Sequence, residues 1–258
     1  MQPEIRHTRD GSTTLFSERF GQHYHNPNGA VAESLHVFFE TPGLIRDIHN
    51  RKPLRLFETG FGTGLNLLLF DMLLNTCHYP HQAEFISVEA WPVSAETVSG
   101  FSFGTHDELT EKIPLLEKIF SSLTRGWNNV EISSRCTLRL YVGTMRQCFH
   151  EEVKIRNVGY FLHDPFSPEV NRELWQADLF RELKKMAEPQ AILSTYCAAS
   201  SARAAMAAAG WFVAKAPGAL GKREMTVASP DPDRLKPYPR VNEERLAERL
   251  SRGDFSDK

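Results

Sequence analysis

The segment Leu54–Gly64, LRLFETGFGTG, constrains the fold of this chain more than any other. Its apolar beginning predicts a buried parallel strand over Leu54–Phe57, and the apolar run Leu65–Leu74 predicts the helix that follows. Three glycines at every second position lie between them. Because glycine has no Cβ, such a turn lets a ligand approach the backbone, and N–H groups at the helix start can bind it. The segment therefore predicts either a site for a nucleotide-like cofactor or a tight strand-to-helix turn that binds nothing.

Alternating apolar and amphipathic segments predict one α/β domain around this turn. Four further parallel strands are expected at Ala83–Val88, Leu138–Val142, Val158–Leu162 and Ala191–Tyr196. Helices are expected at Ile113–Leu123, Glu173–Lys185 and Ser200–Ala209, and a final pair of strands at Trp211–Ala214 and Met225–Ala228. Five β/α units and a terminal hairpin match the seven-stranded sheet of methyltransferases better than the six-stranded parallel sheet of dehydrogenases. We therefore predict a Rossmann-like class I methyltransferase fold with a mostly parallel sheet.

The rest of the chain flanks that domain. Residues 1–45 are expected to form an N-terminal extension, 46–230 the α/β domain and 231–258 a charged tail with a short helix within Val241–Leu250. The extension contains a DG turn, a strand candidate at Thr14–Phe16 and a helix that opens after Asn28-Gly29. It is either a lid over a ligand or a segment that packs on a sheet edge. His23, Tyr24 and His25 are adjacent, so they cannot all face one metal, and no metal is expected.

Composition limits the partners of the chain. A length of 258 residues, 41% hydrophobic and 24% charged, suits one α/β domain. The net charge of −2 gives no general attraction to polyanions, so a nucleic acid would need a local basic patch. The four cysteines form no C-x-x-C pair, which argues against a zinc cage or a disulfide scaffold. With no signal peptide and no apolar run long enough for a bilayer, we expect a cytoplasmic protein without membrane contact.

The spacing around the glycines favours one cofactor. A turn that binds a nicotinamide dinucleotide prefers G-x-G-x-x-G, whereas this chain has E-x-G-x-G-x-G starting at Glu58. That form is typical of S-adenosylmethionine enzymes, in which the carboxylate side meets the charged amino acid end of the cofactor. Glu89, at the end of the second strand, stands where Rossmann-like sheets place a carboxylate on ribose hydroxyls, although a solvated glutamate is the alternative. We predict S-adenosylmethionine as the cofactor.

The segment His163–Pro168, HDPFSP, carries the predicted chemistry. It ends the fourth strand, which lies beside the first in this topology and therefore beside the cofactor. It resembles the D/N-P-P-Y/F signature of enzymes that methylate nitrogen. Proline fixes the turn, so that Asp164 points into the site and accepts a hydrogen bond or a proton from the acceptor amine. Phe166 can stack on a base. The alternative is an ordinary strand-to-turn signal.

Several blocks together resemble one family, the tRNA 5-methylaminomethyl-2-thiouridine methyltransferases of the MnmC methyltransferase domain and the stand-alone MnmD type. The resemblance covers about residues 8–228. It rests on four blocks: DGSTTLFSERFGQHYHNPNGAVAESLHVF, ETGFGTGLN, HDPFSPEVNRELW, and STYCAASSARAAMAAAGW followed by GKREM. The resemblance implies transfer of a methyl group to the aminomethyl substituent of the wobble uridine in tRNA. It also implies the stand-alone type without FAD, because the chain ends before a flavin domain.

The resemblance further implies roles for individual residues. Asp164 would be the catalytic carboxylate. Residues that would line the methyl donor are Glu58, Gly60, Gly62, Gly64, Asn66 and Glu89, with Tyr24 and Glu33 closing over it. Two departures from the family pattern affect the site. Thr144 stands where the family has an aspartate that bonds adenine, and it retains a hydroxyl that accepts one hydrogen bond. Arg172 replaces a proline and adds a candidate phosphate contact.

An almost neutral chain would hold tRNA through local contacts. Candidate residues are Lys222, Arg223 and Arg172 for phosphates, and Phe166 or Trp175 for stacking on the splayed wobble base. For each charge a solvated surface is the alternative, and for Trp175 the alternative is a core position. No obligate protein partner is indicated. Two other functions remain open, a methyltransferase acting on another amine or exocyclic nitrogen, and a relative that binds tRNA without turnover.

Overall fold

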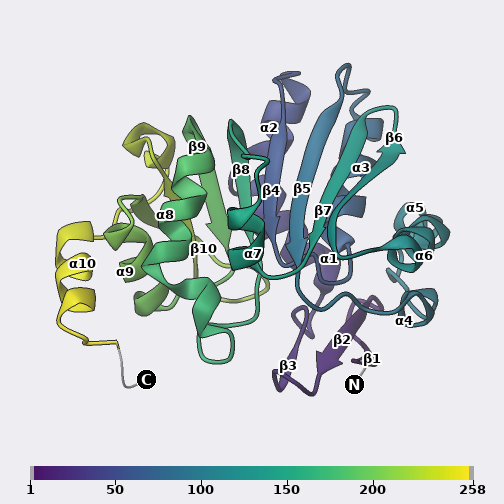
Figure 1. Cartoon of the computed structure of the whole chain (residues 1–258), viewed down its shortest axis with the longest axis horizontal. Helices are drawn as coiled ribbons and strands as arrows, with labels where there is room; N and C mark the ends of the chain where they lie inside the picture. Colours follow the sequence, from purple (N-terminus) through teal and green to yellow (C-terminus); the bar gives the residue numbers. More distant parts are fainter. Residues whose placement is uncertain (1–2, 256–258) are drawn as a thin grey trace.

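Apolar side chains alternate along the central strands and thereby build a three-layer fold. In the computed structural model, which describes residues 3–255, Leu56 of strand β4 (Arg55–Thr59) packs into one core cluster and Phe57 into another. Phe85 and Ile86 of β5 (Ala83–Glu89) alternate in the same way. Because both faces of the sheet are apolar, both must be covered by helices. Figure 1 shows the sheet between these helical layers.

The main sheet has the order β10-β11-β9-β8-β4-β5-β7-β6. The remaining strands are β6 (Gly126–Ser133), β7 (Cys136–Val142), β8 (Val158–His163), β9 (Ala187–Thr195), β10 (Phe212–Pro217) and β11 (Glu224–Ser229). The five central strands are parallel, whereas β6, β11 and β10 each run antiparallel to an inner neighbour. The predicted parallel strands and terminal hairpin are confirmed. Strand β6 was not predicted, and it gives the sheet eight strands instead of seven.

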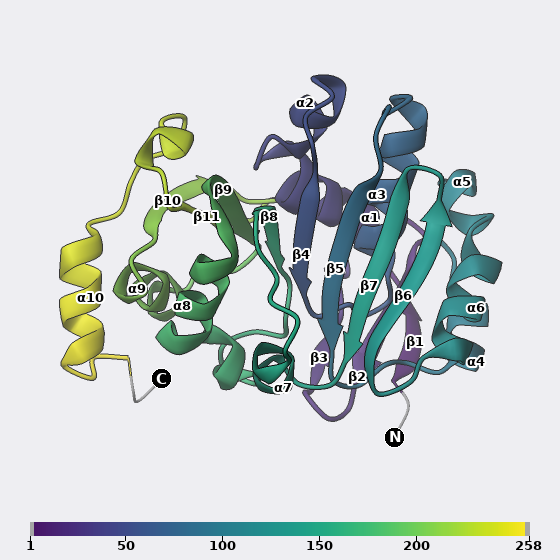
Figure 2. The ribbon, with the colours of Figure 1, turned by 45° about the horizontal axis from the view of Figure 1, so that its top comes forward.

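Two groups of helices cover the sheet (Figure 2). One face packs on α1 (Ala30–Ser34), the π-helical η1 (Leu35–Glu40), α2 (Leu44–His49), α3 (Leu65–Thr76) and α6 (Ile113–Ser122), with the short α4 (Ala95–Ser99) and α5 (Asp107–Thr110) preceding α6. The other face packs on α7 (Met145–His150), α8 (Ala177–Met186) and α9 (Ser200–Ala208). After the single turn η3 (Pro232–Leu235), helix α10 (Glu243–Ser251) packs on α9. This confirms the short helix predicted in the C-terminal tail. The last three residues of the chain lie outside the described range.

The N-terminal extension forms a small antiparallel sheet of its own. Its strands are β1 (Glu4–His7), β2 (Thr13–Ser17) and β3 (Gln22–His23). The strand predicted at Thr14–Phe16 is confirmed within β2. Figure 1 draws this sheet in purple beyond the edge at which β4 and β5 end. Ligands of open α/β sheets bind outside the carboxyl ends of the strands, so the extension lies next to the expected site.

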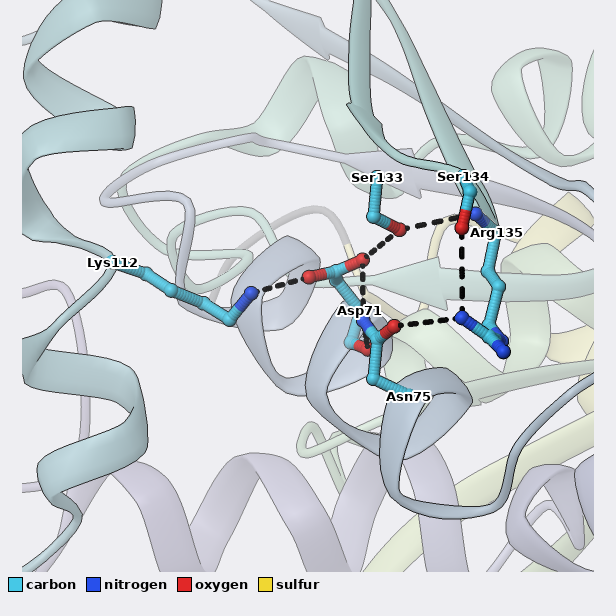
Figure 3. A network of polar contacts seen from close by, with 6 residues as sticks. All are labelled: Asp71, Asn75, Lys112, Ser133, Ser134 and Arg135. Atoms are coloured by element: carbon cyan, nitrogen blue, oxygen red, sulfur yellow. Dashed lines mark hydrogen bonds and ion pairs between the residues drawn. The ribbon is translucent and has the colours of Figure 1, made fainter.

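A polar network around the buried Asp71 side chain joins α3, the start of α6 and the β6–β7 turn (Figure 3). Asp71 of α3 is fully buried, and its two carboxylate oxygens accept from Lys112 Nζ at 2.5 Å and Ser133 Oγ at 2.6 Å. Asn75 Nδ2 donates to the same carboxylate at 3.1 Å, and Arg135 Nη1 donates to Asn75 Oδ1 at 3.4 Å. The network ties α3 to the start of α6 and to the β6–β7 turn.

Candidate active site

The carboxyl ends of β4, β5, β7 and β8 surround a cavity of about 750 Å³. Cofactor sites in proteins span roughly 300–1,000 Å³, so this volume suits an organic ligand with an acceptor group beside it. The predicted site residues that line the cavity are Tyr24, Glu33, Gly60, Gly62, Glu89, Thr144, Asp164, Phe166 and Lys222. The structure thus brings together side chains from the extension, the glycine turn and the segment HDPFSP.

Glycine is required at Gly60 and at Gly64 for different structural reasons. Gly60 has a φ of +88°, and a Cβ there would lie 3.2 Å from the backbone oxygen of Asp164. Gly60 therefore permits β4 and the segment after β8 to approach each other at the cavity wall. Gly64 begins α3 and does not line the cavity; a Cβ there would lie 2.8 Å from Leu116 Cδ2. The third glycine serves packing of the helix, not direct contact with a ligand.

Glu58 lies beneath the turn and does not line the cavity. It is 1% exposed, and its two carboxylate oxygens accept from Asn66 Nδ2 at 2.9 Å and Ser87 Oγ at 2.7 Å. Burial raises the pKa of Glu58 to about 8, against the effect of these two hydrogen bonds. Its oxygens are engaged inside the protein in this structure, and direct contact of Glu58 with the cofactor stays a prediction.

Asn66 is also buried and connects Glu58 to the predicted catalytic residue. Its Nδ2 lies 2.9 Å from Glu58 Oε1 and 3.3 Å from Asp164 Oδ2, so one amide donates to two carboxyl groups. Asn66 does not line the cavity. In this structure Asn66 contacts Asp164 and Glu58, and its contact with the cofactor stays a prediction.

Asp164 directly follows β8 and is half-buried at the cavity wall. Burial raises its pKa well above the ordinary aspartate value, and the nearby carboxyls of Glu58 and Glu33 raise it further. The hydrogen bond from Asn66 and the charge of Lys222 act in the opposite direction. A carboxylate with a raised pKa is a stronger base than an ordinary aspartate, so this position can accept a proton from an amine.

Glu89 and Thr144 form the wall at the ends of β5 and β7. The Glu89 carboxylate accepts from the backbone N–H of Gly62 at 2.9 Å and of Trp91 at 2.8 Å, and burial raises its pKa. Thr144 caps α7, because its Oγ1 accepts from the backbone N–H of Gln147 at 3.2 Å and the Gln147 side chain accepts from the Thr144 N–H. This capping box explains a threonine at the position whatever the cavity binds.

The N-terminal extension contacts the HDPFSP segment directly. The rings of Phe20 and Phe166 stack with centroids 4.4 Å apart, and Tyr24 meets Phe166 edge-on at 5.0 Å. Gln22 donates to Ser167 Oγ at 2.7 Å and accepts from the Ser167 backbone N–H at 3.3 Å. The extension thus lines the cavity, and its role as a lid over a ligand stays a prediction.

An ion pair joins the extension to the C-terminal hairpin. Glu33 Oε1 lies 2.7 Å from Lys222 Nζ, although the two residues are 189 positions apart. Glu33 Oε2 also accepts from the backbone N–H of Asn26 at 3.1 Å, and the Lys222 ammonium lies 5.2 Å from the Tyr196 ring centroid. Lys222 therefore lines the cavity with its charge already paired with that of Glu33.

Three predicted substrate contacts lie outside the cavity. Trp175, at the end of the single turn η2 (Arg172–Trp175), is 5% exposed and donates from its indole to the Phe166 carbonyl at 2.8 Å. It supports the loop from behind, so we no longer propose it as a stacking surface. Arg172 and Arg223 are exposed at positions that do not line the cavity.

Several lining residues were not predicted. They include Arg19, Phe20, Gln22, Trp91 and Tyr196. The guanidinium of Arg19 lies 3.7 Å from the Trp91 ring centroid, and Trp91 is 53% exposed. The available signal was a tryptophan just after Glu89, together with aromatic and basic residues clustered in the extension.

None of the helices within the described residues, 3–255, is long and apolar enough to cross a membrane. Within the same range, no group of three or more His, Cys, Asp or Glu side chains is arranged to hold a metal ion.

Comparisons with known proteins agree with the fold. A family described as S-adenosyl-L-methionine-dependent methyltransferase matches residues 107–231. The bifunctional protein MnmC of tRNA 5-methylaminomethyl-2-thiouridine biosynthesis from Cupriavidus metallidurans is 32% identical over 220 residues, which cover 83% of this chain and 32% of that protein. The protein of the same name from Aromatoleum aromaticum is 34% identical over 223 residues, with coverages of 84% and 34%. The chain thus spans about a third of the length of these relatives. The crystal structure of MNMC2 from Aquifex aeolicus matches with a TM-score of 0.73 and 24% identity, covering 96% of this chain and 75% of that one, which shows a shared fold.

Proposed function

The chain belongs to the MnmC methyltransferase-domain family of S-adenosyl-L-methionine-dependent enzymes, and on that premise we propose that it methylates the 5-aminomethyl group of the wobble uridine in tRNA. The product would be 5-methylaminomethyluridine, or its 2-thio form, at position 34. The observation that carries this proposal is Asp164, a carboxyl with a raised pKa held at the cavity wall beside the glycine turn.

The residues of the turn fit the methyl donor. Gly60 and Gly62 present backbone without Cβ to the cavity, and Glu89 stands at the end of β5, where Rossmann-like sheets bind ribose hydroxyls. Thr144 would face the adenine side, while Tyr24 and Glu33 would close over the donor from the extension. When bound, S-adenosylmethionine supplies a methyl group that its sulfonium has already activated. The protein therefore needs chiefly to position the acceptor nitrogen.

Asp164 prepares the acceptor. A free alkylammonium has a pKa near 10 and no lone pair, so it must lose a proton before it can attack. Asp164 accepts that proton or a hydrogen bond from the amine and thereby directs the lone pair toward the donor side of the cavity. Asn66 holds the carboxylate in place through its hydrogen bond of 3.3 Å. Since the base must be ionised, the rate should fall as the pH drops through the raised pKa of Asp164.

The acceptor side suits RNA held by a few local charges. Lys222 is paired with Glu33, so Arg223, which is exposed beyond the cavity, is the better candidate for a phosphate contact. Arg172, also exposed beyond the cavity, stays a second candidate. Phe166 offers an aromatic wall two residues from Asp164. A tRNA acceptor places the reaction in the cytoplasm.

The test is methylation of tRNA that carries the unmodified aminomethyl group. The purified protein, S-adenosylmethionine and such tRNA should yield methylaminomethyluridine by nucleoside mass spectrometry. Asp164→Asn should reduce the rate by about 10²–10⁴-fold, the usual contribution of a positioned acid or base, while calorimetry shows retained binding of S-adenosylhomocysteine. Glu169→Gln, an exposed acid on the same loop, is the control and should change little.

The outcomes separate the alternatives. Donor binding without tRNA methylation would point to another amine as the acceptor. Binding of tRNA without any donor binding would favour a non-catalytic relative. Equal loss of donor binding and rate in Asp164→Asn would make that residue structural.

A further inference from the structure

The stacked pair Phe20 and Phe166 is the feature of the cavity that the proposed chemistry does not yet use. Both rings line the cavity and both are half-buried. Their centroids lie 4.4 Å apart with an interplanar angle of 26°, so each ring covers one face of the other. A base therefore cannot lie flat on the covered face of Phe166 in this arrangement.

The two rings belong to supports of different rigidity. Phe166 follows Asp164 by two residues, and its carbonyl accepts from the buried indole of Trp175 at 2.8 Å. Phe20 lies in the turn between β2 and β3, beside Gly21, which has a φ of +61° and open space around its Cβ position. Two hydrogen bonds between Gln22 and Ser167 join that turn to the Phe166 loop. Phe166 is thus fixed from behind by Trp175, whereas Phe20 is carried by the β2–β3 turn, which is held to its neighbours by the Gln22–Ser167 hydrogen bonds and the Arg19–Trp91 contact.

We propose that the acceptor base inserts between Phe20 and Phe166, so that Phe20 is a second stacking wall contributed by the N-terminal extension. A planar ring between two others needs about 7–8 Å between the outer rings, two contact distances of about 3.5–4 Å. Opening from 4.4 Å therefore requires the hairpin tip to move outward by roughly 3 Å. Stacking on aromatic side chains is the usual way in which proteins hold a base splayed out of RNA.

This inference rests on the proposed function and specifies how the site selects its acceptor. A base held against Phe166 brings its 5-substituent to the part of the cavity that contains Asp164. A small free amine gains nothing from the slot, whereas a planar nucleobase does. The pair therefore selects an unstacked base, with Asp164 acting on the amine that the base carries.

The experiment measures whether Phe20 and the base depend on each other. Binding titrations use an anticodon stem-loop with 5-aminomethyluridine at the wobble position and the same RNA with an abasic site there. In the wild type, loss of the base should weaken binding by about 5- to 150-fold, the range for stacking of one base. Phe20→Leu should lower that ratio at least about fivefold, and Phe20→Tyr should preserve it.

Phe16→Leu is the matched control, because Phe16 lies on the same hairpin and does not line the cavity, although its ring packs edge-on against that of the lining residue His23. Unchanged binding of S-adenosylhomocysteine and an unchanged melting temperature exclude a folding defect in Phe20→Leu. An unchanged base dependence in Phe20→Leu would overturn the proposal. Tighter RNA binding by Phe20→Leu would also overturn it, since Phe20 would then be a cover that RNA must displace. Base-dependent binding without methyl transfer would contradict the proposed function but leave the slot intact.

Discussion

The Asn66 amide connects two carboxyl groups that have different tasks. Its Nδ2 donates to fully buried Glu58 and to half-buried Asp164. Burial raises the pKa of Glu58 to about 8 and the pKa of Asp164 well above its ordinary value, so the two carboxyl groups are coupled across one amide. Only Asp164 lines the cavity, and its position therefore makes it the candidate base, with Glu58 behind it.

Glu58→Gln should change how stability depends on pH. Between the ordinary glutamate pKa of 4.5 and about 8, the folded wild type keeps a proton on Glu58 that the unfolded chain releases. The stabilisation that the protonated Glu58 contributes to the fold is therefore fully present below pH 4.5 and is lost as the pH rises toward 8. Glutamine cannot ionise, so the variant should gain free energy of unfolding relative to wild type between about pH 5 and 8.

Urea unfolding at a series of pH values measures this difference. Glu131→Gln, at an exposed position on β6, is the control and should show no pH-dependent difference from wild type. Comparing variant with wild type cancels the contribution of His25, whose pKa burial lowers to about 4. A wild-type-to-variant difference that stays constant across the series would contradict the raised pKa of Glu58.

At the residue scale, the sequence predicts where a side chain lies along a strand, but it does not predict which other side chains it contacts. Asp164 and Glu89 were placed at the cavity because strand ends of a parallel sheet share one edge. The contact of Glu58 with Ser87 was not predicted, because Ser87 lies 29 residues away on the neighbouring strand, where no local pattern reveals it. Trp175 is a residue type that often stacks on bases, and only its burial in the folded chain shows that it supports the Phe166 loop instead.

Among the elements, the buried ones were the predictable ones. Strands β4, β5 and β8 are mostly buried and carry apolar residues on both faces of the sheet, and α6 has a clear amphipathic period. Strand β6, with the sequence GWNNVEIS, is polar and only partly buried because it is an edge strand, paired on one side alone. Edge strands commonly carry polar residues, so the apolar signal that reveals an inner strand is weak there.

The network around Asp71 makes a prediction about how α6 is attached. Lys112→Met leaves the fully buried Asp71 carboxylate without its cation, which should cost about 3 kcal/mol of the free energy of unfolding. Asp71→Asn should cost less, about 1–2 kcal/mol, because the Lys112 side chain is 27% exposed and its ammonium can turn to water. The order of the two losses follows from which charge is left buried.

Chemical denaturation of both variants measures the two losses. Lys118→Met, on the exposed side of the same helix, is the control and should lie within about 0.5 kcal/mol of wild type. Equal losses in Lys112→Met and Asp71→Asn would contradict the asymmetry, and a neutral Lys112→Met would show that the ion pair does not stabilise the fold.

On the scale of the whole molecule, the net charge limits how the proposed tRNA substrate can be held. A net charge of −2 provides no long-range attraction to a polyanion. The cavity is lined in part by the N-terminal extension, and the Glu33–Lys222 ion pair joins that extension to the turn between β10 and β11. Phosphate contacts must therefore come from a few cations near the cavity. Sequence could supply the candidates, but Lys222 is committed to Glu33, which only the folded chain reveals.

The salt dependence of tRNA binding counts those contacts. Each phosphate neutralised adds roughly 0.7–0.9 to the negative slope of log K against log salt concentration. Three or four contacts should give a slope of about −2 to −4. Arg223→Gln should make the slope shallower by about 0.7–0.9 and weaken binding of all tRNAs alike, because a phosphate contact carries no base information. Lys118→Gln, on α6, should leave the slope unchanged. A wild-type slope near zero would mean that phosphates do not hold the RNA, and a change in tRNA preference by Arg223→Gln would mean that this side chain contacts a base.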